Sequence, residues 1–287
     1  MSKNEYVKSA FPYVGGKYKL LPQIIPLLPT DTNLFVDLFS GGFNVGINAP
    51  CKRVIYNDTL KPVVEIIKHI YNTKTEEMLS EIQSYIDNYS LTKENKKGYL
   101  EFRADYNSHL KENKSNPMEL FALICYGFNN QIRFNSKGEF NMPFGKDRSS
   151  FNPVLKEKFI AFAEAMHNKE VIITSMDFTQ LKVEKLTSKD FVYLDPPYLG
   201  SLATYNEQKG WSETEETALL KLCDELTEHK VRFALSNNLK YENNILKNWL
   251  EENKEKYITH YLGSQYTNCN YHKKDKTKDI EVLITNY

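Results

Sequence analysis

Six short and continuously apolar runs alternate with helical patterns along most of the chain. The runs cover residues 34–39, 54–56, 171–174, 191–194, 231–235 and 281–285. Runs of this kind are typical of parallel strands that are buried on both faces. The helical patterns include residues 62–71, 214–229 and 241–251, and the second opens with a capping box from Ser212 to Glu215. This alternation predicts an α/β fold with a doubly wound, Rossmann-like sheet.

The alternation stops between residues 61 and 166, where helical segments dominate. A long interruption of a repeating pattern predicts an inserted subdomain. We therefore expect one domain made of residues 1–60 and 167–287, and a second, helical domain made of residues 61–166.

The expected insertion contains one pair of strand-like segments, residues 131–134 and 139–142, around the turn Asn135-Ser-Lys-Gly. This pattern predicts a β-hairpin. Its period of two gives one face with Ile132, Phe134, Phe140 and Met142 and another with Arg133, Glu139 and Asn141. One face can pack while the other meets a ligand. The aromatic residues Phe121, Tyr126 and Phe128 are expected in the core of the insertion.

Composition excludes several classes of protein and site. The 287 residues hold 37 Lys and Arg against 37 Asp and Glu, so a nucleic-acid partner cannot be argued from total charge. The four cysteines form no CxxC pair, the six histidines show no HExxH spacing, and Ser40 has no plausible His partner, so metal sites and triad catalysis are not supported. No apolar run is long enough to cross a membrane. We expect a soluble, cytoplasmic protein without a metal.

A glycine turn follows the first strand, in the segment Phe35-Val-Asp-Leu-Phe-Ser-Gly-Gly. Such a strand-turn-helix arrangement suits a nucleotide-like cofactor, because glycine lets the backbone approach the ligand closely. The second strand ends in Asn57-Asp58, and an acidic residue at this place typically accepts hydrogen bonds from ribose hydroxyls. The alternatives are a tight turn without a ligand and, for Asp58, a cap for the next helix.

The strand at residues 191–194 ends in Asp195-Pro196-Pro197-Tyr198. Proline cannot continue a central strand, so the two prolines end it rigidly at the carboxyl edge of the sheet, where such folds bind ligands. The tetrapeptide thereby brings two hydrogen-bond acceptors, the Asp195 carboxylate and the Pro196 carbonyl, to one point beside an aromatic ring. The alternative is a simple Pro-Pro turn after a core strand.

Together these segments resemble the Dam-type class (D12 class, alpha group) of DNA adenine N6-methyltransferases. The resemblance rests on Phe11-Pro-Tyr-Val-Gly-Gly-Lys17, Asp37-Leu-Phe-Ser-Gly-Gly, Asn57-Asp58, Asp195-Pro-Pro-Tyr and the hairpin at residues 128–146, in this order over almost the full chain. The chain departs from the class at Asn130-Gln131, where relatives often carry Gly-Leu, and at Tyr13, where many carry Trp.

The resemblance implies roles for individual residues. It implies that S-adenosylmethionine is bound by Tyr13, Gly15, Gly16, Lys17, Asp37, Phe39, Ser40, Gly41, Asp58, Asp177, Phe178 and Asp195. It implies that catalysis uses Asp195, Pro196, Pro197 and Tyr198. It implies that DNA is contacted by the hairpin residues Arg133, Asn135, Lys137, Asn141 and Lys146. For Arg133 the alternative is a cross-strand pair with Glu139 or Asn141.

The implied activity is transfer of a methyl group to N6 of an adenine in a short duplex sequence, such as the palindrome GATC, within a restriction-modification system. An adenine inside a duplex cannot reach the sheet edge, so it must be flipped out. Double-stranded DNA is the expected partner. A cognate restriction endonuclease would share only the recognised DNA sequence with this protein. Lysines between residues 263 and 278 are expected to contact phosphates, and the loop at residues 201–211 is expected to close over the pocket.

Two other functions share some of these features. An amino-methyltransferase acting on RNA or on a protein amide would carry the same tetrapeptide, and a non-enzymatic nucleic-acid-binding module could retain the fold. The hairpin favours DNA methylation over the first alternative. The intact tetrapeptide and glycine turn disfavour the second, because a binding module does not need both.

Overall fold

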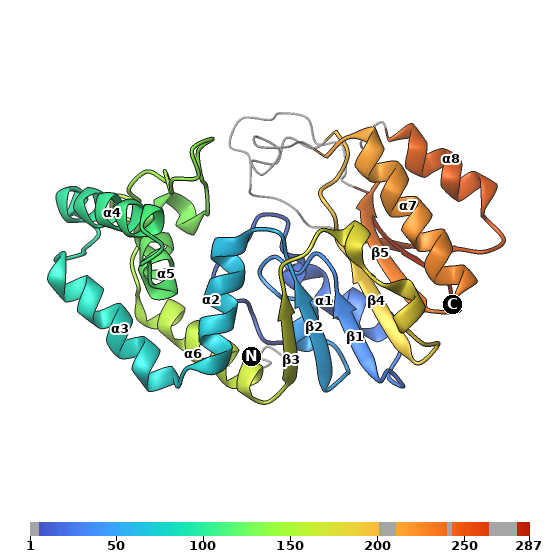
Figure 1. Ribbon diagram of the computed structural model, residues 1–287, viewed down its shortest axis with the longest axis horizontal. Helices are drawn as coiled ribbons and strands as arrows, with labels where there is room; N and C mark the ends of the chain where they lie inside the picture. The colour runs from blue at the N-terminus through green and yellow to red at the C-terminus, as the bar shows by residue number, and fades with distance from the viewer. Residues whose placement is uncertain (1–5, 201–210, 240–242, 264–279) are drawn as a thin grey trace.

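The computed structural model describes residues 6–200, 211–239, 243–263 and 280–287. In this part of the chain seven strands form one sheet in the order β3-β2-β1-β4-β5-β7-β6 (Figure 1). The strands are β1 (Leu34–Asp37), β2 (Arg53–Asn57), β3 (Glu170–Thr174), β4 (Asp190–Leu194), β5 (Arg232–Asn238), β6 (Ile258–Leu262) and β7 (Glu281–Thr285). The mixed α/β fold and all six strands expected from the sequence are confirmed.

The direction of the last strands corrects the sequence prediction. Strands β3, β2, β1, β4 and β5 are parallel to one another, whereas β7 runs antiparallel to both β5 and β6. The apolar run at residues 281–285 predicts a parallel strand like the others, and this prediction is wrong. Because β7 is reversed, its first residue, Glu281, lies beside Asn238 at the end of β5. Strand β6 is not predicted, since it lies at the sheet edge and its segment ITHYL has no continuous apolar run.

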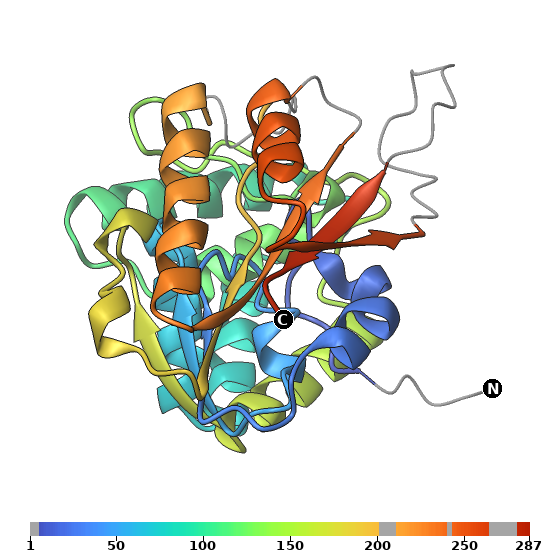
Figure 2. The same ribbon diagram turned by 90° about the vertical axis from the view of Figure 1, so that its right-hand side faces the viewer.

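Helices cover both faces of the sheet. The α-helices of the described residues are α1 (Leu21–Ile24), α2 (Lys61–Asn72), α3 (Thr75–Asn88), α4 (Lys96–Lys111), α5 (Pro117–Tyr126), α6 (Pro153–His167), α7 (Glu213–Glu228) and α8 (Asn244–Glu252), of which α3 and α4 lie away from the sheet (Figure 1). Short 3-10 helices are η1 (Lys17–Leu20), η2 (Ile25–Leu27), η3 (Gly46–Asn48), η4 (Phe128–Asn130), η5 (Phe178–Gln180) and η6 (Val183–Lys185). Figure 2 shows α7 and α8 on one side of the sheet and the short N-terminal helices, in blue, on the other. The predicted capping box at Ser212 is confirmed.

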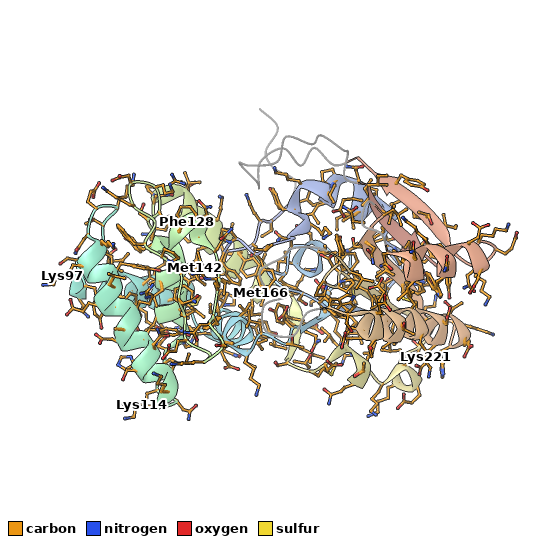
Figure 3. The ribbon with its side chains drawn as sticks, turned by 90° about the horizontal axis from the view of Figure 1, so that it is seen from above. Lys97, Lys114, Phe128, Met142, Met166 and Lys221 are labelled. Atoms are coloured by element: carbon orange, nitrogen blue, oxygen red, sulfur yellow. The ribbon has the colours of Figure 1, made fainter. Side chains whose placement is uncertain are left out.

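Two hydrophobic cores result from this arrangement, because successive strand residues point to opposite faces. Val36 packs with α7 and α8 in one core. Phe35 belongs to the other core, which continues through Ile66 of α2 to Phe121 of α5. The helical segment between β2 and β3 therefore shares its core with the sheet. Figure 3 shows Phe128 and Met142 of this segment at the opposite end of the molecule from Lys221 of α7.

The predicted hairpin is present as a turn but without two regular strands. Gly138 donates its backbone N–H to the Asn135 carbonyl at 2.9 Å, and the isolated bridges within the described ranges are Phe134 with Phe140 and Gly127 with Phe144. Two backbone hydrogen bonds join the arms, from the Asn135 N–H to the Glu139 carbonyl at 2.9 Å and from the Asn141 N–H to the Arg133 carbonyl at 3.0 Å. The second arm, residues 139–142, also bonds to α4. Its carbonyl groups accept hydrogen bonds from three side chains of that helix, namely Tyr99, Arg103 and Asn107.

The alternation of faces in this hairpin agrees with the prediction. Phe140 and Met142 are buried, and Ile132 and Phe134 pack against the same core. Phe121 and Tyr126 are buried as expected. Phe128 is not, because its side chain is 40% exposed and the Arg148 guanidinium lies 5.3 Å from its ring centre. Figure 1 shows the hairpin, in green, on the side of the molecule where the parallel strands end.

Candidate active site at the carboxyl edge of the sheet

Three carboxylates meet at the ends of neighbouring parallel strands. Asp37 is the last residue of β1, Asp58 follows β2, and Asp195 follows β4. These strands are adjacent in the order β2-β1-β4 and their ends are in register, with Asp37 opposite both Tyr56 and Tyr193. Parallel strands place their ligand sites at this edge. The structure thus brings together three of the predicted site residues that lie far apart in the sequence.

Asp195 forms a buried ion pair with Lys17. The Lys17 Nζ lies 2.7 Å from Asp195 Oδ1, and the lysine side chain is 4% exposed while that of the aspartate is 17% exposed. The same Nζ donates a hydrogen bond to the Gly15 carbonyl at 2.9 Å. Burial raises the pKa of the Asp195 carboxyl, and Lys17 acts against this shift. The pair therefore joins the N-terminal Gly-Gly-Lys segment to the tetrapeptide after β4.

Tyr198 completes this corner of the site. Its hydroxyl donates to Glu281 Oε2 at 3.0 Å and lies 3.4 Å from Asp195 Oδ1. The Lys17 Nζ lies 5.1 Å from the centre of its ring, within the range of a cation–π interaction. Pro196, between the aspartate and the tyrosine, is buried. Sequence analysis missed Glu281, because a strand taken as parallel would place this residue at the opposite edge.

The glycine turn is fixed by hydrogen bonds between β1 and β2. The Ser40 hydroxyl donates to the Asp37 carbonyl at 2.7 Å and accepts from the Asn57 N–H at 3.0 Å. Gly41 has φ +49°, and a Cβ there would lie 2.8 Å from Cδ1 of Tyr13. Glycine is needed here both for the backbone conformation and for the close approach of the Tyr13 ring.

Gly41→Ala should therefore weaken binding of the cofactor predicted from the sequence, as well as stability. Alanine at positive φ costs about 1 kcal/mol or more, and its methyl group would also displace Tyr13. Gly138→Ala is a matched control, because Gly138 has φ +75° but a Cβ there would meet no atom within 4 Å. We expect both variants to lower the melting temperature and only Gly41→Ala to lower the affinity for S-adenosylmethionine in calorimetry. Equal affinity of the two variants for S-adenosylmethionine would show that the contact between Tyr13 and Gly41 does not contribute to cofactor binding.

Asp58 is predicted to bind ribose hydroxyls, with a cap for the next helix as the alternative, and in the structure its carboxylate accepts from two backbone N–H groups. Its Oδ1 accepts from the Leu60 N–H at 2.8 Å, ahead of α2, and its Oδ2 accepts from the Gly41 N–H at 2.9 Å. The first bond is that of an Asx turn ahead of α2, whose N-cap residue is Leu60 and has no side-chain cap. The second holds the glycine turn. Burial raises the pKa of this carboxyl.

Asp37 carries an oxygen without a hydrogen-bond partner. Its Oδ2 accepts from the Gly46 N–H at 2.9 Å, but Oδ1 is buried and has no partner among the described residues. Burial, the nearby Asp195 and the nearby Asp58 raise the pKa of Asp37 to about 8. An unpaired buried acceptor is costly. A cationic ligand would satisfy it, and S-adenosylmethionine, which carries a sulfonium and an ammonium group, fits this set of carboxylates.

An aromatic cluster lies beside the glycine turn. The Phe39 ring centre lies 5.5 Å from that of Phe178 and 5.9 Å from that of Trp211. Asp177, also predicted to bind the cofactor, is exposed, and its side chain caps η5 through the Thr179 N–H. Sequence analysis placed Trp211 at the end of the loop expected to close over the pocket but did not name it as a site residue. A hydrophobic staple does not mark it, because the fourth residue of α7 is Glu216, to whose Oε2 the Trp211 Nε1 donates at 2.6 Å.

The predicted DNA-contacting residues lie together on the hairpin. Arg133 donates from Nε to Asn141 Oδ1 at 2.8 Å and from Nη2 to the Asn141 carbonyl at 3.0 Å. Asn135 donates to Glu139 at 3.0 Å. Lys137 and Lys146 are exposed. The cross-strand pair of Arg133 with Asn141, the alternative to base contact, is therefore present in this structure.

Some predictions fall on parts of the chain outside the described residues. These are residues 201–210 of the loop predicted at 201–211 and the basic cluster Lys273, Lys274, Lys276 and Lys278. Within the described ranges, no group of three or more His, Cys, Asp or Glu side chains is arranged to hold a metal ion. No helix found there is long and apolar enough to cross a membrane.

Comparison with known proteins identifies the family. The family model for D12 class N6 adenine-specific DNA methyltransferases matches residues 13–268. The chain belongs to this family. The matched region contains Tyr13, Lys17, the glycine turn, the hairpin and the tetrapeptide, whereas Glu281 lies beyond it. Membership confirms the resemblance seen in the sequence.

Several curated relatives are similar to this chain over nearly its whole length. Type II methyltransferase M.FokI from Planomicrobium okeanokoites is 43% identical over 99% of this chain, and modification methylase StsI from Streptococcus sanguinis is 39% identical over 100% of it. These alignments cover 43% and 44% of the two relatives, so the chain spans less than half of their length. Type II methyltransferase M1.LlaDCHI from Lactococcus lactis is 28% identical over 96% of this chain, and there the match covers 94% of the relative.

Proposed function

We propose that this D12 family chain transfers a methyl group from S-adenosylmethionine to N6 of an adenine flipped out of duplex DNA, at a short recognition sequence in a restriction-modification system. The observation that carries the proposal is the meeting of Asp37, Asp58 and Asp195 at one sheet edge, with an unpaired buried oxygen on Asp37. The relatives named as modification methylases support the assignment to restriction-modification.

The reaction requires an activated amine. The N6 lone pair of adenine is delocalised into the ring, so the amine is a poor nucleophile. We assign its two hydrogens to the Pro196 carbonyl and to Asp195 Oδ2, since Lys17 already binds Oδ1. Acceptors on both hydrogens favour a tetrahedral nitrogen with a free lone pair, and they act as preorganised electrostatics. When bound, S-adenosylmethionine would supply a methyl group on a positively charged sulfur, which would leave as a neutral thioether, and the methylated amine would then lose one proton to solvent.

Tyr198 would stack on the extruded base. Stacking on an aromatic side chain contributes about 1 to 3 kcal/mol per base, which offsets part of the few kcal/mol that extrusion costs. The carboxylates around Asp37 would hold the positive groups of the cofactor. In-line positioning of amine and methyl group then supplies much of the remaining rate enhancement.

The helical segment between β2 and β3, with its hairpin, would form the recognition domain at residues 61–166. The hairpin lies on the same side of the molecule as the strand ends (Figure 1). Arg133, Asn135, Lys137, Asn141 and Lys146 would contact the DNA there. This arrangement favours a DNA substrate over an RNA or a protein amide, because recognition of those substrates does not require the hairpin.

The proposal is tested by incubating plasmid DNA with the purified protein and S-adenosylmethionine labelled in its methyl group. We expect the label in N6-methyladenine, at one position of a single short sequence. Sequencing that detects modified adenines would identify this sequence. Label in RNA or protein but not in DNA would contradict the proposal.

Arg133→Ala should relax sequence preference more than it lowers affinity. Arginine in the major groove can bind guanine bidentately, which gives about 1 to 3 kcal/mol of discrimination. Lys137→Ala is the control. Loss of a phosphate contact should weaken binding equally for all sequences and reduce the slope of log affinity against log salt concentration by about one. Binding of cognate and single-mismatch duplexes at several salt concentrations separates the two. A uniform loss for Arg133→Ala would make it a phosphate contact.

A further inference from the structure

Glu281 is a buried carboxylate that the proposed reaction does not use directly. It is the first residue of β7, its relative exposure is 7%, and β7 pairs it with Asn238 of β5. The next four residues of the strand, 282–285, are all buried and none of them is charged. Burying a carboxylate costs free energy unless donors compensate it, so its partners are informative.

Both oxygens of Glu281 have donors. Oε2 accepts from the Tyr198 hydroxyl at 3.0 Å, and Oε1 accepts from Asn238 Nδ2 at 3.3 Å. Burial raises the pKa of this carboxyl, with nearby Lys17 acting against the shift. The residue therefore joins the end of β5 to the tyrosine that follows β4.

The Tyr198 ring is held from two directions. Glu281 binds its hydroxyl at one end, and the Lys17 ammonium lies 5.1 Å from the centre of its ring. Lys17 is itself fixed by Asp195 at 2.7 Å. A tyrosine side chain rotates about two bonds, and a fixed hydroxyl together with packing of the ring removes most of this freedom.

We propose that Glu281 is a positioning residue for methyl transfer, whose carboxylate holds the Tyr198 phenol so that its ring is oriented to stack on the extruded adenine. This inference rests on the proposed function. A preoriented ring lowers the entropy lost when the base is captured, and misplacement by about 1 Å can cost about 10²-fold in rate. Glu281 acts through Tyr198 and does not touch the base.

The test compares Glu281→Ala, Glu281→Gln, Tyr198→Phe and the Glu281→Ala/Tyr198→Phe double variant with the wild type. Glutamine keeps the shape and an acceptor oxygen, so Glu281→Gln should retain activity within about 3-fold of the wild type. Glu281→Ala and Tyr198→Phe each remove the same hydrogen bond. We expect each to lower kcat about 10-fold or more, with KM for S-adenosylmethionine changed less than about 3-fold.

The double variant decides whether Glu281 acts through Tyr198. If it does, the double variant should be no slower than Glu281→Ala, because residues in one network are not additive. Multiplied losses would overturn the inference, as would a Glu281→Gln variant as slow as Glu281→Ala or a loss confined to cofactor affinity. A wild type that methylates no DNA would instead overturn the proposed function. Thermal melting of each variant identifies losses due to unfolding.

Discussion

Asp195→Ala should lower the rate of methyl transfer by about 10²- to 10³-fold or more. This is the range seen when one preorganised hydrogen-bonding group is removed from a transition state. Binding of duplex DNA should change little, because the proposed DNA contacts lie on the hairpin between Arg133 and Lys146. Single-turnover rates and fluorescence anisotropy measure the two quantities. Equal rates for variant and wild type would contradict the role of Asp195.

The ion pair with Lys17 requires a control for folding. Removing the Asp195 carboxylate leaves the Lys17 ammonium buried without this partner, and this is destabilising. Asp195→Asn keeps the shape and an oxygen that can accept from Lys17. We expect Asp195→Asn to retain most of the thermal stability and to remain strongly impaired in catalysis, since it lacks the negative charge. A low rate in a well-folded Asp195→Asn protein therefore reports chemistry.

Asp37→Asn should weaken binding of S-adenosylmethionine by about 10- to 100-fold. A buried hydrogen bond to a charged group contributes about 1.5 to 3 kcal/mol, and Asp37 Oδ1 is the unpaired oxygen that a positive ligand group would reach. Isothermal calorimetry at pH 8 measures this loss. An Asp37→Asn variant with wild-type affinity would show that the cofactor does not use this carboxylate.

The same substitution should change how stability without cofactor depends on pH. The Asp37 pKa is about 8 in the fold, against an ordinary value of 3.8. Between these values the folded protein holds a proton that the unfolded chain has lost, so Asp37 makes stability fall as pH rises from about 4 to about 8. The slope from one such group is at most about 1.4 kcal/mol per pH unit. In denaturant titrations at several pH values, Asp37→Asn should lack this contribution to the fall of stability with pH. An unchanged slope of stability against pH would contradict the raised pKa of Asp37.

The sheet edge could be predicted from the sequence because local patterns and topology agree there. An apolar run followed by Asp, as at Asp37 and Asp195, indicates a buried strand with a polar end. Parallel strands then bring these ends together. The alternation of Phe140 and Met142 with Asn141 in the hairpin was predictable for the same reason, since the period of a strand places every second residue on one face.

Other features depend on tertiary contacts that no local pattern contains. The second arm of the hairpin bonds to α4 as well as to the first arm, which depends on Asn107 lying opposite the Phe140 backbone. Glu281 reaches Tyr198 only because β7 is antiparallel, and a run of apolar residues does not specify strand direction. Edge strand β6 has no clear pattern because both of its faces carry exposed residues, Ile258 on one and Tyr261 on the other.

The most direct test is an experimental structure of the protein with duplex DNA that contains the mapped target sequence and with a nonreactive analogue of S-adenosylmethionine. We expect one adenine outside the helix, stacked on Tyr198, with its amine within about 2.6 to 3.2 Å of both an Asp195 carboxylate oxygen and the Pro196 carbonyl. An adenine that remains stacked in the duplex, or an amine that contacts neither acceptor, would contradict this account.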